Sequence, residues 1–532
     1  MFRLFSVVTA LFFFASPAHA EWRRASSDHF VVYSESRAAD LRDFAETLER
    51  FHKAMELETG VTIPSPSPSS RLTVYMVGND RELKELYGNR NSNVAGFYVP
   101  RASGSIAFVP FIKIGSGGPD FSLTVLLHEY AHHFLISSSR HAMPRWLSEG
   151  SAEYFASARF HSDGSVDIGL PNNDRAWELA NASKVSLDQL FDREKYRQKR
   201  GRSYDAFYGR SWLLYHYLRF EESREGQLNR YRASLNGGMD PLAAAQAAFG
   251  DLGQLEGELR AYNKRRRMAG MRFGKEVVTI GKIDVSDLSE GHSAMMDVIM
   301  QSARGVTTEQ AADLLVKARA IANNYPADPA VQAGLAEAEY DAEDDTAAIA
   351  AAERALKFDA TNKKALIFKG LALFRQAQGA EERDVAYRAA MKPFQQLNAI
   401  ENDHPLPLIY FYRSFTERGR APSDQAEHAL ERALQLAPFD HDLALQVATM
   451  HASKGNAELA SYILAPIAAN PHGGERAAFA VALSDALSNV PEGTPIDVAA
   501  VRDTMVDEAE IDDDDDDSAD EGEEETRIGP SR

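Results

Sequence analysis

The 532-residue chain contains no cysteine, so disulfide bonds, thiol catalysis and thiolate metal ligands are excluded. A lipid anchor attached to a cysteine after a signal peptide is excluded for the same reason. The chain does not need disulfides to fold, because a protein of this length can bury large hydrophobic cores. Its hydrophobic content of 44 % is that of a soluble globular protein, with about two or three domains.

Long hydrophobic runs are scarce, and only the one at the N-terminus stands out. Arg3 is followed by an apolar stretch over 4–15 and then by Ala-His-Ala at 18–20. This order is typical of a signal peptide, and the apolar stretch is too short for a membrane span. We therefore expect residues 1–20 to be cleaved and the mature protein to be periplasmic or secreted, with no stable membrane span. An uncleaved N-terminal anchor is the alternative.

Clusters of positive charge are also few. The run Lys-Arg-Arg-Arg at 264–267 is short and isolated, so we expect no binding to nucleic acid. The net charge of −20 arises mainly at the C-terminus, because residues 507–525 include 14 acidic residues and no lysine or arginine. Such a composition cannot build a core, and we predict a disordered acidic tail over 491–532.

Between residues 21 and 270 the hydrophobic pattern alternates between strand and helix periods, which predicts an α+β domain with a small mixed sheet. Strands are predicted at 29–33, 72–77, 94–99 and 105–109, and helices at 38–59, 80–87, 121–136, from 144 onward, 203–222 and 240–265. A linker is predicted over 271–305.

From 306 to 490 the chain is rich in alanine and leucine, and pairs of helices recur. The turn residues Pro326 and Ala360 lie 34 residues apart, a period that resembles the tetratricopeptide repeat. One repeat, between 376 and 417, is out of register. We predict an all-α repeat domain that binds a protein partner, and a non-repetitive helical domain is the alternative.

The segment His-Glu-Tyr-Ala-His at 128–132 has the pattern of a metal-binding helix. His128 and His132 are four residues apart, so on a helix both rings lie on one face and can bind one ion. Glu129 would lie beside the metal and take a proton from its bound water. Two unrelated histidines on a helix are the alternative.

A second helical pair follows in a mostly apolar segment. Glu149 and Glu153 are four residues apart, and carboxylates in apolar surroundings need a compensating partner. We interpret Glu149 as the third ligand of one Zn²⁺ ion per chain, and Glu153 as the acceptor of a hydrogen bond from a ligand histidine. A plain surface carboxylate is the alternative for Glu153.

The motif at 128–132, followed by Trp-Leu-Ser-Glu-Gly-Ser-Ala at 146–152, resembles the gluzincin (peptidase MA-like) zinc metallopeptidases. The resemblance implies that residues 21–270 form a metallopeptidase domain that hydrolyses peptide bonds, with the HExxH helix at its centre. It also implies an edge strand that pairs with extended substrate, which we place at Ile106, Ala107 and Phe108. An ordinary sheet strand is the alternative.

A donor to the oxyanion is also required. Tyr208 lies in a Tyr-x-x-Ser pattern similar to that of related peptidases, and we predict that it is this donor. The alternative is a core stripe on one helix, made of Tyr204, Tyr208, Ser211 and Tyr215.

Two other functions remain open at this point. One is a catalytically inactive metallopeptidase-like scaffold whose repeats bind protein partners, and the other is an adaptor that binds no metal. The intact Glu129 favours the enzyme.

Overall fold

The structure is a computed structural model that describes residues 21–115, 120–138, 143–198, 204–470 and 473–512. The predicted signal peptide at 1–20 and the far part of the acidic tail at 513–532 lie outside the described residues. Among the described helices, none is both long enough and apolar enough to cross a membrane. Most of the described chain is helical, and its named strands lie in two small sheets.

A mixed sheet forms near the N-terminus, as predicted, but it has six strands where the sequence predicts four. Its strands in spatial order are β4 (Phe97–Val99), β5 (Ile106–Pro110), β3 (Leu72–Val77), β2 (Phe30–Ser34), β1 (Arg23–Ser26) and β9 (Asp284–Asp287). Strands β2, β3 and β5 are parallel, whereas the other described pairings of this sheet are antiparallel. Helix α1 (Ala38–Thr59) connects β2 to β3, and α2 (Asp80–Tyr87) follows β3. Both helices have the predicted bounds.

Alternate residues of the central strands enter two different cores. Val74 of β3 packs in the core that contains α1 and α3 (Phe121–Ser138), whereas its neighbour Tyr75 packs in a second core on the other face. Successive side chains of a strand point to opposite faces, so this sheet is buried on both sides. The second core also contains α2, α12 (Glu290–Arg304) and the helices of the C-terminal half. The two halves of the chain therefore share one hydrophobic core.

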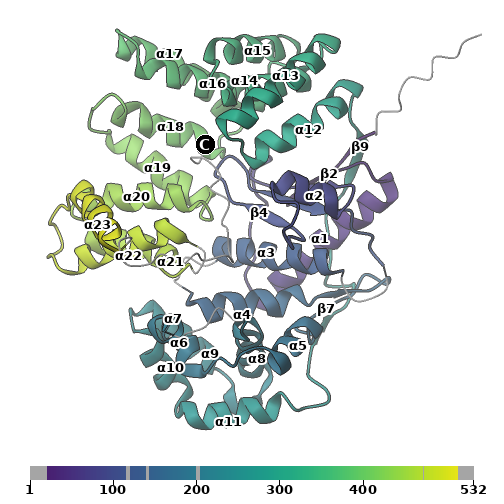
Figure 1. The fold of residues 1–532 in the computed structure, drawn as a ribbon, viewed down its shortest axis with the longest axis vertical. Coiled ribbons are helices and arrows are strands. Elements are labelled where there is room, and N and C mark those ends of the chain that lie inside the picture. Colours follow the sequence, from purple (N-terminus) through teal and green to yellow (C-terminus); the bar gives the residue numbers. More distant parts are fainter. Residues whose placement is uncertain (1–20, 116–119, 139–142, 199–203, 471–472, 513–532) are drawn as a thin grey trace, which may run out of the picture.

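Helices α3 and α4 (Arg145–Ala156) pack together below the sheet, and α4 also packs on α8 (Phe207–Phe220) (Figure 1). The other elements of this region are β6 (Arg159–Phe160), β7 (Val166–Ile168), α5 (Asn173–Asn181), α6 (Leu187–Phe191), α7 (Arg193–Arg197), a 3-10 helix (Glu222–Arg224), α9 (Gln227–Asn236), α10 (Pro241–Phe249), α11 (Leu252–Tyr262) and β8 (Met271–Phe273). Strands β6, β7 and β8 form the second sheet.

The single helix predicted over 240–265 is wrong, because the chain forms α10 and α11 there. Gly250 between them has φ 78°, a left-handed value that ends a helix. Asp251 then caps α11 by accepting hydrogen bonds from the main-chain N–H groups of Gly253 and Gln254.

The linker predicted over 271–305 is also wrong. Strand β8 pairs with β7, and β9 pairs with β1, so the chain returns to both sheets. Helix α12 then buries Met295 and Met296 in the shared core. The sequence of β9, Asp-Val-Ser-Asp, lacks the hydrophobic alternation that predicts a strand, because its side chains are mostly exposed. Main-chain pairing with β1 holds the strand in place.

The C-terminal half is an array of paired helices. They are α13 (Thr308–Asn324), α14 (Pro329–Asp341), α15 (Asp345–Phe358), α16 (Lys363–Gln378), α17 (Arg383–Ile400), α18 (Pro405–Thr416), α19 (Asp424–Leu436), α20 (His441–Ser453), α21 (Ala457–Ala468) and α22 (Gly474–Ser488). Helices α14, α16, α18, α20 and α22 begin at residues 329, 363, 405, 441 and 474, so the repeat lengths are 34, 42, 36 and 33 residues. The long repeat overlaps 376–417, which the sequence predicts to be irregular.

The tail predicted to be disordered over 491–532 contains one more helix, α23 (Val498–Asp512). Apolar residues at 498, 501 and 505 pack beside the last helices of the array. They recur at steps of three and four residues, which is a helical pattern. The acidic composition outweighed this pattern in the prediction, so the tail assignment is wrong over 498–512.

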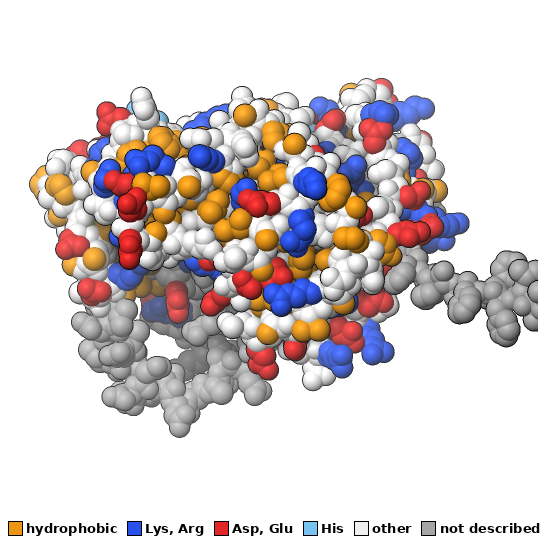
Figure 2. Space-filling model, turned by 90° about the horizontal axis from the view of Figure 1, so that it is seen from above, with side chains coloured by type: hydrophobic (Ala, Val, Ile, Leu, Met, Phe, Trp, Pro, Cys, Tyr) orange, Lys and Arg blue, Asp and Glu red, His pale blue; other side chains and the backbone are white. Residues whose placement is uncertain are grey.

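Two buried carboxylates hold the array against the sheet. Glu401, after α17, accepts hydrogen bonds from the main-chain N–H and the hydroxyl of Ser69, at 2.9 and 3.0 Å. Asp440, which caps α20, accepts from the main-chain N–H of Ala102 at 2.7 Å. The array begins with α13 above the sheet and curves down so that α21 lies at the level of α3 (Figure 1). Seen from above, the molecule has hydrophobic side chains interspersed with both acidic and basic ones (Figure 2).

Candidate metal centre

Three helices meet at the predicted site, and a glycine sets their spacing. Helix α3 carries the HExxH motif, α4 carries Glu149 and Glu153, and α8 begins beside them. A Cβ atom on Gly150 would lie 2.5 Å from the main-chain oxygen of Ser211 in α8. Glycine is therefore required at this position for the backbones of α4 and α8 to approach so closely.

The structure brings the three predicted ligand atoms into one triangle. Nε2 of His128 lies 3.1 Å from Nε2 of His132, and Oε2 of Glu149 lies 3.3 and 3.5 Å from these two nitrogens. Ligand atoms bound at about 2.0–2.1 Å to a tetrahedral zinc ion are about 3.3 Å apart. The donor set and its spacing therefore fit one zinc ion. Within the described residues, this is the one cluster of three such side chains that could hold a metal.

The two glutamates make this triangle attractive to a cation. Glu149 is 1 % exposed and Glu153 is 2 % exposed. Burial lowers the pKa of His128, but the hydrogen bonds and negative charges of these two glutamates outweigh burial and raise the pKa well above its usual value. The local field is therefore strongly negative, and a divalent cation would be stabilised by the same field.

Glu153 lies beside the other ring nitrogen of His128, as the sequence predicts. Its Oε1 is 3.3 Å from Nδ1 of His128 and 2.8 Å from Nη2 of Arg175. Burial raises the pKa of Glu153, but His128 and Arg175 outweigh burial and hold the pKa below its ordinary value. An ionised carboxylate here fixes the orientation of the ring and leaves Nε2 facing the triangle.

Sequence analysis missed three polar residues that support these groups. The hydroxyl of Ser148 lies 3.2 Å from Nδ1 of His132, and Asn172 donates a 3.4 Å hydrogen bond to Glu153. Arg175, on α5, pairs with the same carboxylate. Ser148 directly precedes a predicted ligand, which was an available signal. Asn172 and Arg175 had none, because they come from a separate helix and its cap.

Glu129 is half-buried on α3, directly after His128 in the chain. It has no hydrogen bond or ion pair with any other described residue. Its charge contributes to raising the pKa of the Tyr98 phenol in β4, after the larger effect of burial. A carboxylate without a protein partner is available to water and substrate, as a general base must be.

Tyr208 lies in the first turn of α8, with its ring centroid 6.4 Å from that of His128. The guanidinium carbons of Arg175 and Arg145 lie 5.1 and 5.9 Å from the centre of the tyrosine ring. The alternative prediction, a core stripe, is wrong at its first member, because Tyr204 is 61 % exposed and precedes α8. The structure therefore brings Tyr208 to the predicted ligands but leaves Tyr204 at the surface.

The edge strand predicted at Ile106, Ala107 and Phe108 is wrong. These residues belong to β5, which lies between β3 and β4. They pair with Val99, Tyr98 and Phe97 of β4. The turn at 101–104 folds the two strands into an antiparallel hairpin, so the strand that comes first in the chain lies outermost. In the described part of the chain, β4 has no strand partner on its outer side.

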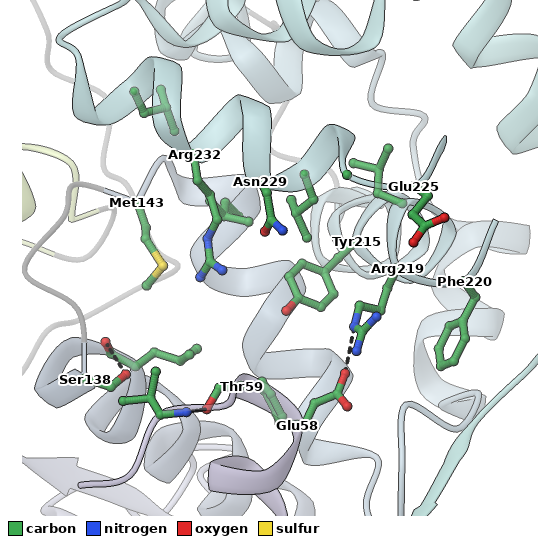
Figure 3. Close-up of a pocket in the computed structure, with 18 of the residues that line it drawn as sticks. Glu58, Thr59, Ser138, Met143, Tyr215, Arg219, Phe220, Glu225, Asn229 and Arg232 are labelled. Atoms are coloured by element: carbon green, nitrogen blue, oxygen red, sulfur yellow. Dashed lines mark hydrogen bonds and ion pairs between the residues drawn. The ribbon is translucent and has the colours of Figure 1, made fainter. Parts of the chain in front are cut away.

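A cavity of about 840 Å³ lies elsewhere, between α1, α4, α8 and α9. Glu58 and Arg219 form an ion pair at one side of it, and Met143 and Arg232 lie at the other (Figure 3). None of the predicted site residues is among its described lining residues. The cavity is therefore separate from the candidate metal centre.

Comparisons with known proteins give a family match but no characterised relative. A family model described as a protein of unknown function, DUF1570, matches residues 123–236. No curated protein matches the chain. The matched region contains all three members of the triangle, together with Glu129, Glu153 and Tyr208.

Solved structures show weak likeness at low sequence identity. A thermophilic TPR protein of Thermus thermophilus is 13 % identical, with a TM-score of 0.31, over 36 % of this chain and 98 % of its own. MamA of Desulfovibrio magneticus is 14 % identical, with a TM-score of 0.26, over 37 % of this chain and 97 % of its own. The helical array is recognised from its own helix pairs rather than from this likeness.

Proposed function

We propose that this protein is an exported, zinc-dependent metallopeptidase of the gluzincin type, which hydrolyses peptide bonds. The observation that carries the proposal is the triangle of His128, His132 and Glu149, whose donor atoms are 3.1 to 3.5 Å apart. Two histidines and one glutamate are a donor set that catalytic zinc sites use, with the fourth position left for water or substrate.

Each neighbouring side chain has a role in this reaction. A bound zinc ion would polarise the scissile carbonyl and acidify a water molecule. Glu129 accepts the proton of the attacking water and passes it to the leaving nitrogen. Tyr208 donates a hydrogen bond to the carbonyl oxygen as negative charge develops there. Glu153 holds the ring of His128 in place through Nδ1.

The outer side of β4 is the surface on which an extended substrate would pair. Its main chain has no strand partner among the described residues, and peptides commonly add to such an edge. Tyr98 of this strand is bonded to His133 of α3 at 2.7 Å, which ties the edge to the helix that carries the ligands. This arrangement supports a peptide or protein substrate.

Export and partner binding rest on other parts of the chain. The support for export is the N-terminal sequence over 1–20. The support for a protein partner is the helical array, because stacked helix pairs form extended binding surfaces.

A peptide-library digestion tests the proposal. We expect the wild-type protein to contain about one zinc ion per chain and to cleave peptides. Glu129→Gln should keep the zinc but lose about 100- to 10,000-fold in rate, because the general base is missing. Glu309→Gln, at an exposed position of α13, is the matched control and should behave as wild type.

Other outcomes would replace the enzyme by one of its two alternatives. If the protein holds zinc but wild type and Glu129→Gln are equally inactive, the inactive scaffold with partner-binding repeats is favoured. If purified protein holds less than about half an equivalent of zinc, where a three-ligand site should fill, the metal-free adaptor is favoured.

A further inference from the structure

One cation beside the candidate centre forms no ion pair with a carboxylate in the described part of the chain. Arg145 is the first residue of α4, one helical turn before Glu149. No carboxylate of the described residues forms an ion pair with it, and its buried Nε has no hydrogen-bond partner. The neighbouring Arg175, by contrast, pairs with both Glu153 and Glu178. Of the two guanidinium groups beside Tyr208, Arg145 is therefore the one left for a ligand.

The start of α4 contributes nothing that holds a cation. The N-terminal end of a helix carries positive partial charge, and the first turn of α4 contains no acidic residue to offset a cation. The guanidinium is held by aromatic rings instead, 4.3 Å from the centre of Phe207, 5.3 Å from Tyr196 and 5.9 Å from Tyr208. The rings and the hydroxyls of Tyr196 and Tyr208 position the group, and none of them is a carboxylate that would neutralise its charge.

Its position connects Arg145 to the reaction site. The ring of Tyr208 is the common neighbour, because it also lies 6.4 Å from the ring of His128. Burial lowers the pKa of Arg145, but attraction to Tyr208, Tyr196 and Glu149 outweighs burial and raises the pKa. A group bound to this guanidinium would lie next to the oxyanion donor and to the third ligand.

We propose that Arg145 binds a carboxylate of the peptide substrate. The inference rests on the peptidase function proposed above. Zinc and Arg175 would offset much of the charge of Glu129, Glu149 and Glu153, and Arg145 adds a fixed cation with which an anionic substrate can pair. A guanidinium can form two parallel hydrogen bonds with a carboxylate, which also fixes its orientation. The carboxylate has two possible sources, the C-terminus of the peptide or an acidic side chain near the scissile bond.

Three pools of N-acetylated hexapeptides distinguish these sources. The first has no acidic side chain and a free C-terminal acid, the second is its C-terminal amide, and the third is the amide with one glutamate at varied positions. We expect wild type to cleave the first or the third pool at least about tenfold more efficiently than the second, because a charged hydrogen-bonded pair forms only with a carboxylate. Preference for the first pool identifies a C-terminal carboxylate, and preference for the third identifies a side chain.

Variants at position 145 decide whether the arginine provides this preference. Arg145→Gln should abolish it while the amide pool is cleaved at the wild-type rate, and Arg145→Lys should restore part of it. Arg81→Gln, on the exposed side of α2, is the control and should keep the full preference. Equal cleavage of all three pools by wild type would overturn the inference. So would an equal loss on all pools in Arg145→Gln, which would show that Arg145 only positions Tyr208.

A binding measurement separates failure of this inference from failure of the proposed function. The three pools compete for Glu129→Gln protein in equilibrium dialysis, and bound peptides are counted by mass spectrometry. We expect carboxylate-bearing peptides to be enriched at least about tenfold, and the enrichment to vanish when Arg145→Gln is added. Enrichment without any hydrolysis would refute the peptidase and keep the carboxylate site. Hydrolysis that depends on Glu129, without enrichment, would refute the carboxylate site alone.

Discussion

The sheet domain and the helical array treat charge in opposite ways. Around α3 and α4, Glu149 and Glu153 are almost fully buried and converge on histidines. In the array, small side chains such as Ala351 and Ala352 fill the core, and the buried carboxylates, such as Glu401 and Glu339, are paired with main-chain N–H groups or with a basic side chain. Other charged groups form surface ion pairs such as Arg476 with Asp442. Buried carboxylates are costly unless they bind something, whereas surface pairs cost little. The difference supports the metal site proposed for the first region and a scaffold role for the second.

The largest expected effect is the loss of metal on changing Glu149. In Glu149→Ala we expect the zinc content after dialysis to fall below about a tenth of an equivalent, because one of three protein ligands is gone. Glu339→Ala is the matched control in the array, since Glu339 is also buried and pairs with Arg319. It should lose stability but keep zinc. Elemental analysis of both proteins checks this, and a full equivalent of zinc in Glu149→Ala would contradict the ligand assignment.

A pair of glycines tests the packing of the same two regions. Gly150→Ala should lower the free energy of unfolding by about 3 kcal/mol, because its Cβ would meet the main chain of Ser211 at 2.5 Å. Gly334→Ala, in α14, should change it by less than about 1 kcal/mol. Its Cβ would meet side chains and no backbone, Cγ of Met295 at 2.8 Å and Cγ1 of Ile299 at 3.4 Å, and alanine favours the helix. Urea unfolding compares the two variants, and equal losses would show that α4 and α8 are not in such close contact.

A smaller effect is expected from the carboxylate that orients His128. Glu153→Gln should weaken zinc binding by about 10- to 100-fold, because the amide holds the ring less strongly than an ionised carboxylate. The control is Glu178→Gln, which keeps Glu153 but alters the other partner of Arg175. It should weaken zinc binding less. Competition with a zinc chelator measures both affinities, and an unchanged affinity in Glu153→Gln would refute the orienting role.

The smallest effect concerns pH and is common to both regions. Burial lowers the pKa of His52, beneath α3, and of His404, in the array, each to about 4. These folded values lie below the ordinary value of 6.5, so the stability they contribute is complete above pH 6.5 and is lost as the pH falls from 6.5 to 4. His404→Asn keeps an acceptor for the N-terminus of α18. In this variant the free energy of unfolding should fall less steeply between pH 6.5 and pH 4. The number of protons taken up on unfolding, which sets this slope, should drop by up to about one. Urea unfolding at several pH values measures the slope, and an unchanged slope would contradict the pKa of His404.

Sequence patterns predicted best those features whose cause lies within one segment. The bounds of α1 were correct because its hydrophobic period and its final glycine occur together. The four-residue helical spacing placed His128 with His132 on one face and Glu149 with Glu153 on another. That the two helices meet was expected from the resemblance to a known family. The order of the strands in the sheet could not be predicted in this way, because the position of β4 outside β5 depends on how the hairpin folds back. Arg175 was missed for a similar reason, since its contact with Glu153 joins two elements and leaves no local pattern.

Because the sheet and the array share a hydrophobic core, no truncation between them leaves both parts with a covered core. A fragment that ends after α11 would lose β9, leaving β1 as a bare edge of the sheet. It would also uncover the face that carries Tyr75 and Phe108. Unpaired edges and large apolar faces promote self-association. Measurements on such a fragment would describe aggregated protein, so the candidate metal centre has to be studied with the array attached.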